Sequence, residues 1–429
     1  MGKLKIGWKT ATALVVSNMI GTGVFTSLGY QIADLKNTYS ILLLWLIGGF
    51  LALIGAFIYS ELASKFKESG GDYIYLSRTY HPVLGYLSSW VSLFVGFSAP
   101  ISLAALAMIK YLNVYGLDLG KEFAIGIILV VAIFQSYSLN LNSKFQNVFT
   151  ILKVVFILLL IGLGLYFAPS ITPNAISYDS TWQNEIILPA FATSLVYVTF
   201  AYTGWNSASY IFSEIKNPRI NLPKALFTGV IFVTISYILL NYVFLKHASS
   251  PSLSLKEDVA NIAFANVLGE NGVKWVSLFI ALQLIATISG YLWIGSRLTQ
   301  ATAKENKLWS FMAPANKNGI PLRAIWLHTA ISIGLIFTGD FEVIFTYTSF
   351  VLQILATMAI STAFFIKPNQ LKIIKSKFFY VLPAIFLAFS LYICYFVLME
   401  KPKESVFGLG IILIGLVLYF FDKNNRYNK

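Results

Sequence analysis

Long apolar stretches separated by short polar segments recur along the whole chain. A helix needs about 20 mainly apolar residues to cross a bilayer. By this criterion the pattern predicts twelve spans, at 7–33, 41–59, 83–109, 123–138, 145–167, 186–212, 226–244, 273–301, 324–337, 341–366, 378–398 and 406–420. No connecting segment is long enough for a separate soluble domain. The predicted fold class is an all-α polytopic membrane protein.

The composition agrees with a membrane location. The 429 residues are 57% hydrophobic and only 11% charged, whereas a soluble domain carries about 25% charged residues. The net charge of +13 does not indicate a nucleic-acid partner, because little of the chain lies outside the spans to form a basic face. With one cysteine, Cys394, and three scattered histidines, we expect no metal site and no cofactor.

The placement of lysine and arginine predicts the topology. Twelve spans put both termini and the even-numbered loops on one side of the membrane. That side then carries 22 of the 31 basic residues and the other side carries 8, while the remaining one, Lys153, lies within a span. Basic residues favour the cytoplasmic side. We therefore expect a protein of the cell membrane with both termini in the cytoplasm.

Two of the predicted spans carry glycine and threonine near their middle. The first contains Gly21-Thr22-Gly23 and the sixth contains Thr203-Gly204. Glycine costs a helix interior about 1 kcal/mol relative to alanine, and an unpaired backbone group in lipid costs several kcal/mol. Either these glycines allow close helix packing, or both helices are interrupted. Interruptions at corresponding places in two halves are typical of transporters with inverted repeats, and we favour that interpretation.

Interrupted helices would bind a zwitterion. A helix that starts inside the membrane offers free N–H groups to a carboxylate, and one that ends there offers carbonyls to an ammonium group. We assign N–H groups near Thr22 to the carboxylate and the carbonyls of Ser17, Phe200, Ala201 and Thr203 to the amine. The predicted substrate-binding residues are Ser17, Ile20, Gly21, Thr22, Gly23 and Val24 in the first span and Phe200, Ala201, Thr203, Gly204, Trp205 and Asn206 in the sixth.

Short motifs in the same regions resemble those of a known family. They are GTGVF at 21–25, YSEL at 59–62, SGGDYIY at 69–75, FAYTGWN at 200–206, EIKNP at 214–218 and NLP at 221–223. Their order and spacing resemble the amino acid–polyamine–organocation (APC) superfamily, above all its L-type amino acid transporter branch. One departure is Thr203, where many L-type relatives have glycine or aspartate.

This resemblance implies a LeuT-type fold that works by alternating access. Such a fold has a 5+5 inverted repeat, here residues 1–168 and 169–366, followed by two additional C-terminal spans in 367–429. The implied function is a secondary active transporter.

Lys153 lies in the fifth predicted span. An ionisable residue within a span is by default a functional candidate, although a lysine near a span end can also extend to the headgroups. Sodium-independent and proton-coupled relatives have a lysine here that takes the place of a sodium ion. Thr287 and Ser289 of the eighth span are candidate neighbours. The sequence leaves open whether Lys153 titrates or stays a fixed cation.

The 18 acidic residues all lie in loops or near span ends, so the pocket should prefer an uncharged side chain. Phe200 and Trp205 are either aromatic walls of the pocket or packing residues. Trp293 is a candidate wall that would hold a cationic group without a carboxylate. At the cytoplasmic span ends, Glu61, Arg78, Glu214 and Arg297 are either a salt-bridge network or solvated surface charges.

The sequence therefore favours a sodium-independent carrier of neutral L-amino acids, acting as an exchanger or a proton symporter. The alternative is a cationic amino acid or polyamine antiporter. A non-transporting receptor or a membrane enzyme is more remote, since HExxH, GxSxG and Walker motifs are missing. The expected partners are the amino acid, the bilayer and, for a symporter, protons, without an obligate protein partner.

Overall fold

The computed structural model describes residues 6–137, 139–169, 180–304, 309–371 and 377–427. Within these residues the chain is helical, apart from one isolated parallel bridge between Ile6 and Ile215. The α-helices are α1 (Trp8–Met19), α2 (Gly23–Asp34), α3 (Thr38–Phe66), α4 (Asp72–Thr79), α5 (Pro82–Val91), α6 (Ala99–Leu112), α7 (Lys121–Gln135), α8 (Leu139–Tyr166), α9 (Trp182–Glu185), α10 (Pro189–Ala201), α11 (Pro218–His247), α12 (Ser250–Leu253), α13 (Val259–Ala303), α14 (Leu322–Ile336), α15 (Phe341–Ser361), α16 (Val381–Glu400) and α17 (Pro402–Tyr427). Shorter segments are the π-helix η1 (Ser92–Ser98) and the 3₁₀-helices η2 (Asn113–Tyr115), η4 (Ser207–Glu214), η5 (Ser310–Met312), η6 (Thr362–Phe365), η7 (Pro368–Gln370) and η8 (Lys377–Tyr380).

The helices bear out a multi-pass membrane protein. In the described part of the chain, eight helices are long and apolar enough to cross a bilayer, and the bent pair α1–α2 makes a ninth candidate. The predicted spans 123–138, 186–212 and 324–337 correspond to α7, α10 and α14, which have 15, 13 and 15 residues. These three are shorter than a full span, so the count of twelve stays a prediction.

The two predicted interruptions are present. Helix α1 ends at Met19 and α2 begins at Gly23, with a bend of 42° between them. Helix α10 ends at Ala201, and after a turn the chain continues as η4. Gly204 in that turn has a φ of +94°, which glycine adopts without the steric cost that a Cβ would bring.

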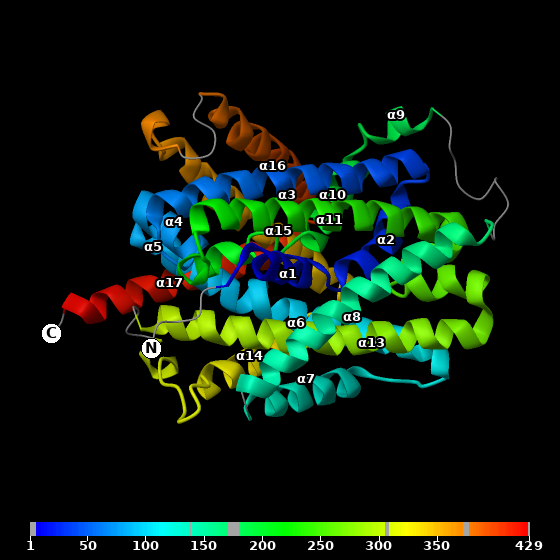
Figure 1. Ribbon diagram of the computed structural model, residues 1–429, viewed down its shortest axis with the longest axis horizontal. Helices are drawn as coiled ribbons and strands as arrows, with labels where there is room; N and C mark the ends of the chain where they lie inside the picture. Colours follow the sequence, from blue (N-terminus) through cyan, green and yellow to red (C-terminus); the bar gives the residue numbers. More distant parts are fainter. Residues whose placement is uncertain (1–5, 138, 170–179, 305–308, 372–376, 428–429) are drawn as a thin grey trace.

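The first helix of the interrupted pair α1–α2 lies at the centre of the bundle. Figure 1 shows α1 in the middle, with α3 and α11 on one side and α6 and α13 on the other. The best apolar windows of α8, α16 and α17 are only 33%, 28% and 28% buried, against 61% for α3. Much of the apolar surface of these three helices is therefore not covered by other parts of the described chain.

The two chain termini lie at the same end of the bundle, at the left of Figure 1, which we call the terminal end. Helix α4 lies at this end and α9 lies at the opposite, distal end. We expected the segment 61–78 to connect two spans, but its first residues continue the preceding helix. Helix α3 continues to Phe66 and buries Glu61, and α4 begins at Asp72.

Candidate functional site

The two helix interruptions touch each other. A Cβ added at Gly23 would lie 2.6 Å from the Cα of Ala201, and one added at Gly204 would lie 2.8 Å from the carbonyl of Asn18. Both distances are shorter than any real Cβ contact, so glycine at these two positions is what permits the approach. The interruption between α1 and α2 therefore packs directly against the one that follows α10.

Free N–H groups gather at the first interruption. The N–H of Ile20 still donates to Val16 as part of α1, and the N–H of Phe25 donates to the carbonyl of Thr22. Between them, the N–H groups of residues 21 to 24 donate no hydrogen bond to any described residue. They include the first turn of α2, where the helix dipole also favours a negative charge.

The carbonyls assigned to the amine divide into two groups. Those of Ser17 and Thr203 accept no hydrogen bond from the described residues. The carbonyl of Phe200 accepts from the backbone N–H of Thr203 at 2.9 Å and from its hydroxyl at 2.7 Å. That of Ala201 accepts from a tyrosine, Tyr237, at 3.2 Å. Two of the four carbonyls therefore already have partners in this conformation.

Tyr237 on α11 was not found from the sequence. Its hydroxyl lies 2.7 Å from the carbonyl of Met19 and 3.2 Å from that of Ala201, so one side chain joins the ends of α1 and α10. The ring packs between Trp45 and Tyr202, with centroids 5.4 and 5.2 Å away. In the sequence this region is a uniform apolar span, and no signal distinguishes this tyrosine from a packing residue.

Lys153 on α8 reaches the first interruption. Its side chain is 2% exposed, and its ammonium donates to the carbonyl of Ile20 at 3.0 Å and to the hydroxyl of Thr287 at 2.9 Å. One turn earlier on the same helix, Thr150 donates to the hydroxyl of Ser17 at 2.9 Å. The lysine is therefore buried beside the end of α1 and does not extend to the headgroups.

Ser289, the other expected neighbour, takes no part in the hydrogen bonds that Lys153 makes within the described chain. It instead accepts from the side-chain amide of Gln135 on α7. Helix α13 has about 3.6 residues per turn. Positions 287 and 289 are two residues apart, so they face different neighbours.

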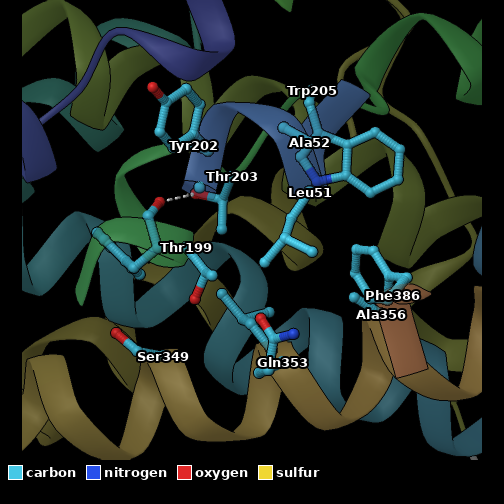
Figure 2. Close-up of a pocket in the computed structure, with 13 residues that line it drawn as sticks. Leu51, Ala52, Thr199, Tyr202, Thr203, Trp205, Ser349, Gln353, Ala356 and Phe386 are labelled. Atoms are coloured by element: carbon cyan, nitrogen blue, oxygen red, sulfur yellow. Dashed lines mark hydrogen bonds between the residues drawn. The ribbon is translucent and has the colours of Figure 1, made fainter. Parts of the chain in front are cut away.

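A cavity of about 40 Å³ lies beside the second interruption, between α3, the end of α10, α15 and α16. Figure 2 shows Thr199, Thr203 and Trp205 on one wall, with Gln353 on α15 and Phe386 on α16. Its lining residues are Gly48, Leu51, Ala52, Thr199, Phe200, Tyr202, Thr203, Trp205, Ser349, Leu352, Gln353, Ala356 and Phe386. Phe200 and Trp205 thus combine both expected roles: they line the cavity and pack on Phe345 and Tyr59 at 4.8 and 4.7 Å.

Trp293 is not among the residues that line this cavity. Its ring faces the guanidinium of Arg297 from the same helix, 5.4 Å from the centroid. The chain's own arginine therefore lies over one face of this ring. Arg78, suggested for a network at the span ends, forms an exposed ion pair with Glu68 at 3.4 Å.

The sequence model of the amino acid permease family matches residues 6–421. The chain belongs to the amino acid permease family. It is similar to the mouse b(0,+)-type amino acid transporter 1, with 27% identity over 97% of this chain and 87% of the relative. The human large neutral amino acids transporter small subunit 2 is 27% identical over 97% of this chain and 80% of the relative. The mouse Asc-type amino acid transporter 1 is 24% identical over 97% of this chain and 81% of the relative.

This permease is therefore a membrane transporter of amino acids and not an enzyme. The resemblance to the APC superfamily is confirmed. The name of the human relative calls it a small subunit. A protein partner for the present permease is thus an open question, and our expectation that it needs none stays untested.

At the distal end of the permease, an aromatic cluster joins α2, α10 and α15. Tyr30 stacks on Phe341 with centroids 6.1 Å apart, and Tyr197 stacks on Phe345 at 4.9 Å. The Tyr30 hydroxyl donates to the carboxylate of Glu257 at 3.1 Å. The segment before α13 is thereby attached to α2.

Glu257 is half-buried, and its environment perturbs it. Burial raises the pKa of this carboxyl, and the nearby charges of Asp258 and Asp340 add to the rise, while Lys110 and the Tyr30 hydroxyl oppose it. The carboxyl therefore holds a proton more tightly in this environment than it would in water.

At the terminal end, the segments that flank the two interrupted helices are joined. Ile6 donates its N–H to the carbonyl of Glu214 at 2.9 Å and accepts from Lys216 at 2.8 Å. Nearby, the carboxylate of Asp72 accepts from Tyr210 of η4 at 2.9 Å and from Tyr59 of α3.

Asp72 lies between two predicted spans, and its burial was not predicted from the sequence. It is only 7% exposed, because the start of α4 folds beneath η4. Burial raises the pKa of its carboxyl, and the two tyrosine hydrogen bonds counteract that rise. The carboxylate holds η4, the second half of the interrupted sixth span, against α3 and α4.

Proposed function

We propose that this permease carries neutral L-amino acids across the cytoplasmic membrane by alternating access, without sodium. The observation that carries the proposal is the contact between two helix interruptions, one with free N–H groups at 21–24 and one with carbonyls at 200–203. An α-amino acid presents a carboxylate and an ammonium group on neighbouring carbon atoms. The two interruptions, which are in direct contact, offer complementary groups.

The carboxylate is proposed to bind the N–H groups of Gly21, Thr22, Gly23 and Val24, and the ammonium group the carbonyls of the α10 end. Ser17 and Thr203 have carbonyls free to accept it. The hydroxyl of Thr203 occupies the Phe200 carbonyl at 2.7 Å. An arriving ammonium group would displace that hydroxyl, since a charged donor forms the stronger hydrogen bond.

Lys153 supports a mechanism without sodium. Its ammonium lies where a cation would neutralise the negative end of α1, and it is held by Ile20 and Thr287 at 3.0 and 2.9 Å. We propose that this fixed contact replaces a bound metal cation. As a fixed cation, the lysine suits an exchanger, whereas proton release from it would make the permease a symporter.

The remaining architecture is proposed to follow the family. Twelve spans in a 5+5 inverted repeat with two C-terminal spans would place both termini in the cytoplasm. The terminal end, with the Ile6–Ile215 bridge and Asp72, would then be the inner gate. The distal end, with the cluster around Tyr30, would be the outer gate.

The choice of a neutral substrate rests on the lining of the cavity. Among its thirteen residues none is charged, and Trp293, which has Arg297 over one of its faces, is not one of them. A cationic substrate would have no carboxylate to meet there. No specific observation favours the cationic or polyamine alternative.

The test is counterflow by the purified protein in proteoliposomes, with sodium replaced by choline. Preloaded vesicles should accumulate labelled neutral amino acids and not arginine, lysine or putrescine. A requirement for internal amino acid would indicate exchange, and acceleration by a pH gradient in empty vesicles would indicate symport. Absence of counterflow with every amino acid, or a strict need for sodium, would refute the proposal.

A further inference from the structure

The cavity beside α10 adjoins the proposed substrate position. Phe200 and Thr203 belong both to the second interruption and to the lining of the cavity. An amino acid whose ammonium group lies at these carbonyls has this cavity as a neighbour for its side chain.

The hydroxyl groups on the cavity wall all have their protons engaged. Thr199 donates to the carbonyl of Val196 at 2.9 Å, and Ser349 donates to that of Phe345 at 2.6 Å. Thr203 donates to Phe200 at 2.7 Å, the hydrogen bond drawn as a dashed line in Figure 2. A hydroxyl has one proton and two lone pairs, so each of the three presents only an acceptor to a further partner.

Gln353 on α15 has the same character. Its side-chain nitrogen donates to the hydroxyl of Ser390 on α16 at 2.7 Å, whereas its side-chain oxygen accepts no hydrogen bond from the described residues. Figure 2 shows this amide pointing from α15 into the cavity, toward the wall that carries Leu51. The side chain is only 5% exposed, and with its nitrogen bonded to Ser390 the oxygen remains to accept a hydrogen bond from an occupant.

Building on the proposed function, we infer that this cavity selects neutral amino acids whose side chains carry a hydrogen-bond donor, such as serine, threonine and asparagine. The cavity lining carries no charge, and four of its side chains offer an acceptor oxygen: Thr199, Thr203, Ser349 and Gln353. A hydroxyl or amide N–H satisfies the oxygen of Gln353, whereas an alkyl side chain of equal size removes water from that oxygen without replacing it. Buried polar groups left without partners are the physical basis for rejecting an analogue.

The selectivity is measured with isosteric pairs that differ only in the donor. Threonine is compared with valine, and serine with 2-aminobutyrate, as competitors for uptake of one labelled substrate in proteoliposomes of the full chain. One neutral hydrogen bond corresponds to about 3- to 10-fold in affinity. We expect the hydroxyl member of each pair to compete better by about that factor.

Two variants assign the effect to the cavity. Gln353→Met keeps the size of the side chain and removes the acceptor, so the threonine-to-valine ratio should fall toward one. Ser349→Ala, a smaller change, should lower the ratio in part and serves if the first variant does not fold. As a matched control, Gln283→Met replaces another buried amide, on α13, that does not line the cavity, and the ratio should persist.

The outcomes separate this inference from the proposed function. If no amino acid is transported, the proposed function fails. If both members of each pair compete equally, or the alkyl member competes better, the function stands and the inference is overturned. A ratio that survives in both cavity variants overturns it as well.

Discussion

Replacing Lys153 with methionine tests the contact between α8 and the first interruption. Methionine keeps most of the volume of the side chain and removes two hydrogen bonds from the ammonium group, to Ile20 at 3.0 Å and to Thr287 at 2.9 Å. Each hydrogen bond to a charged group contributes about 1.5–3 kcal/mol. Burying a charge costs several kcal/mol, and the variant avoids this cost. The lost hydrogen bonds and the avoided burial of a charge therefore change the free energy of unfolding in opposite directions and largely cancel.

Transport should respond more strongly than stability. The bond to Ile20 fixes the end of α1 next to the N–H groups at 21–24, and its loss of about 1.5–3 kcal/mol corresponds to about 10- to 100-fold in the population of that arrangement. We therefore expect the initial rate of counterflow to fall at least about tenfold, with little change in melting temperature.

The control is a lysine that binds carbonyls far from the interruptions. Lys246 donates to the carbonyls of Gly164, Leu165 and Phe167 at the end of α8. Lys246→Met should lower the melting temperature and leave the exchange rate per folded molecule nearly unchanged. If Lys153→Met exchanged at the normal rate, the role given to this lysine would be wrong.

Three further changes test other parts of the account. Gly204→Ala places a Cβ at a φ of +94° and 2.8 Å from the backbone of Asn18, so it should destabilise the permease by about 1–3 kcal/mol in thermal unfolding. The control Gly126→Ala, where nothing lies within 4 Å of the added Cβ, should not destabilise it. Tyr237→Phe leaves two buried carbonyls without their donor and should slow exchange about 5- to 30-fold; a normal rate would contradict its bridging role. Because burial raises the pKa of Glu257 in the packed distal end, this arrangement binds a proton more tightly than one that exposes the carboxyl to water, so acidification should favour the packed arrangement. Spin-label distances across this end should shorten at low pH in the wild type, and Glu257→Gln should remove the dependence; a response that persists in this variant would assign it elsewhere.

The sequence predicted the interruptions because their cause is local. Glycines at 21, 23 and 204 are unfavourable in a helix interior and leave a visible pattern. The burial of Lys153 could also be anticipated, since a lysine within an apolar span is rare. In each case one residue type in an apolar segment carries the information.

The missed features depend on contacts between distant segments. Tyr237 joins two helices that lie 36 and 218 residues away in the chain, and tyrosine is common in apolar spans. Aspartate is a residue type that usually lies on the surface, and Asp72 is buried only because η4 packs against the start of α4. Ser289 is hydrogen-bonded to Gln135 and not to Lys153, and the sequence could not predict this because the direction of Ser289 depends on the rotation of α13 about its axis.

The central claim is that two touching helix interruptions hold the two charged groups of an amino acid. The most direct measurement is a structure of the permease in a lipid nanodisc with a transported amino acid bound. The account predicts the carboxylate within hydrogen-bond distance of the N–H groups at 21–24 and the ammonium group at the carbonyls of 200–203. Substrate density away from both interruptions, or α1–α2 and α10–η4 continuous and fully hydrogen-bonded in the substrate-bound state, would contradict it.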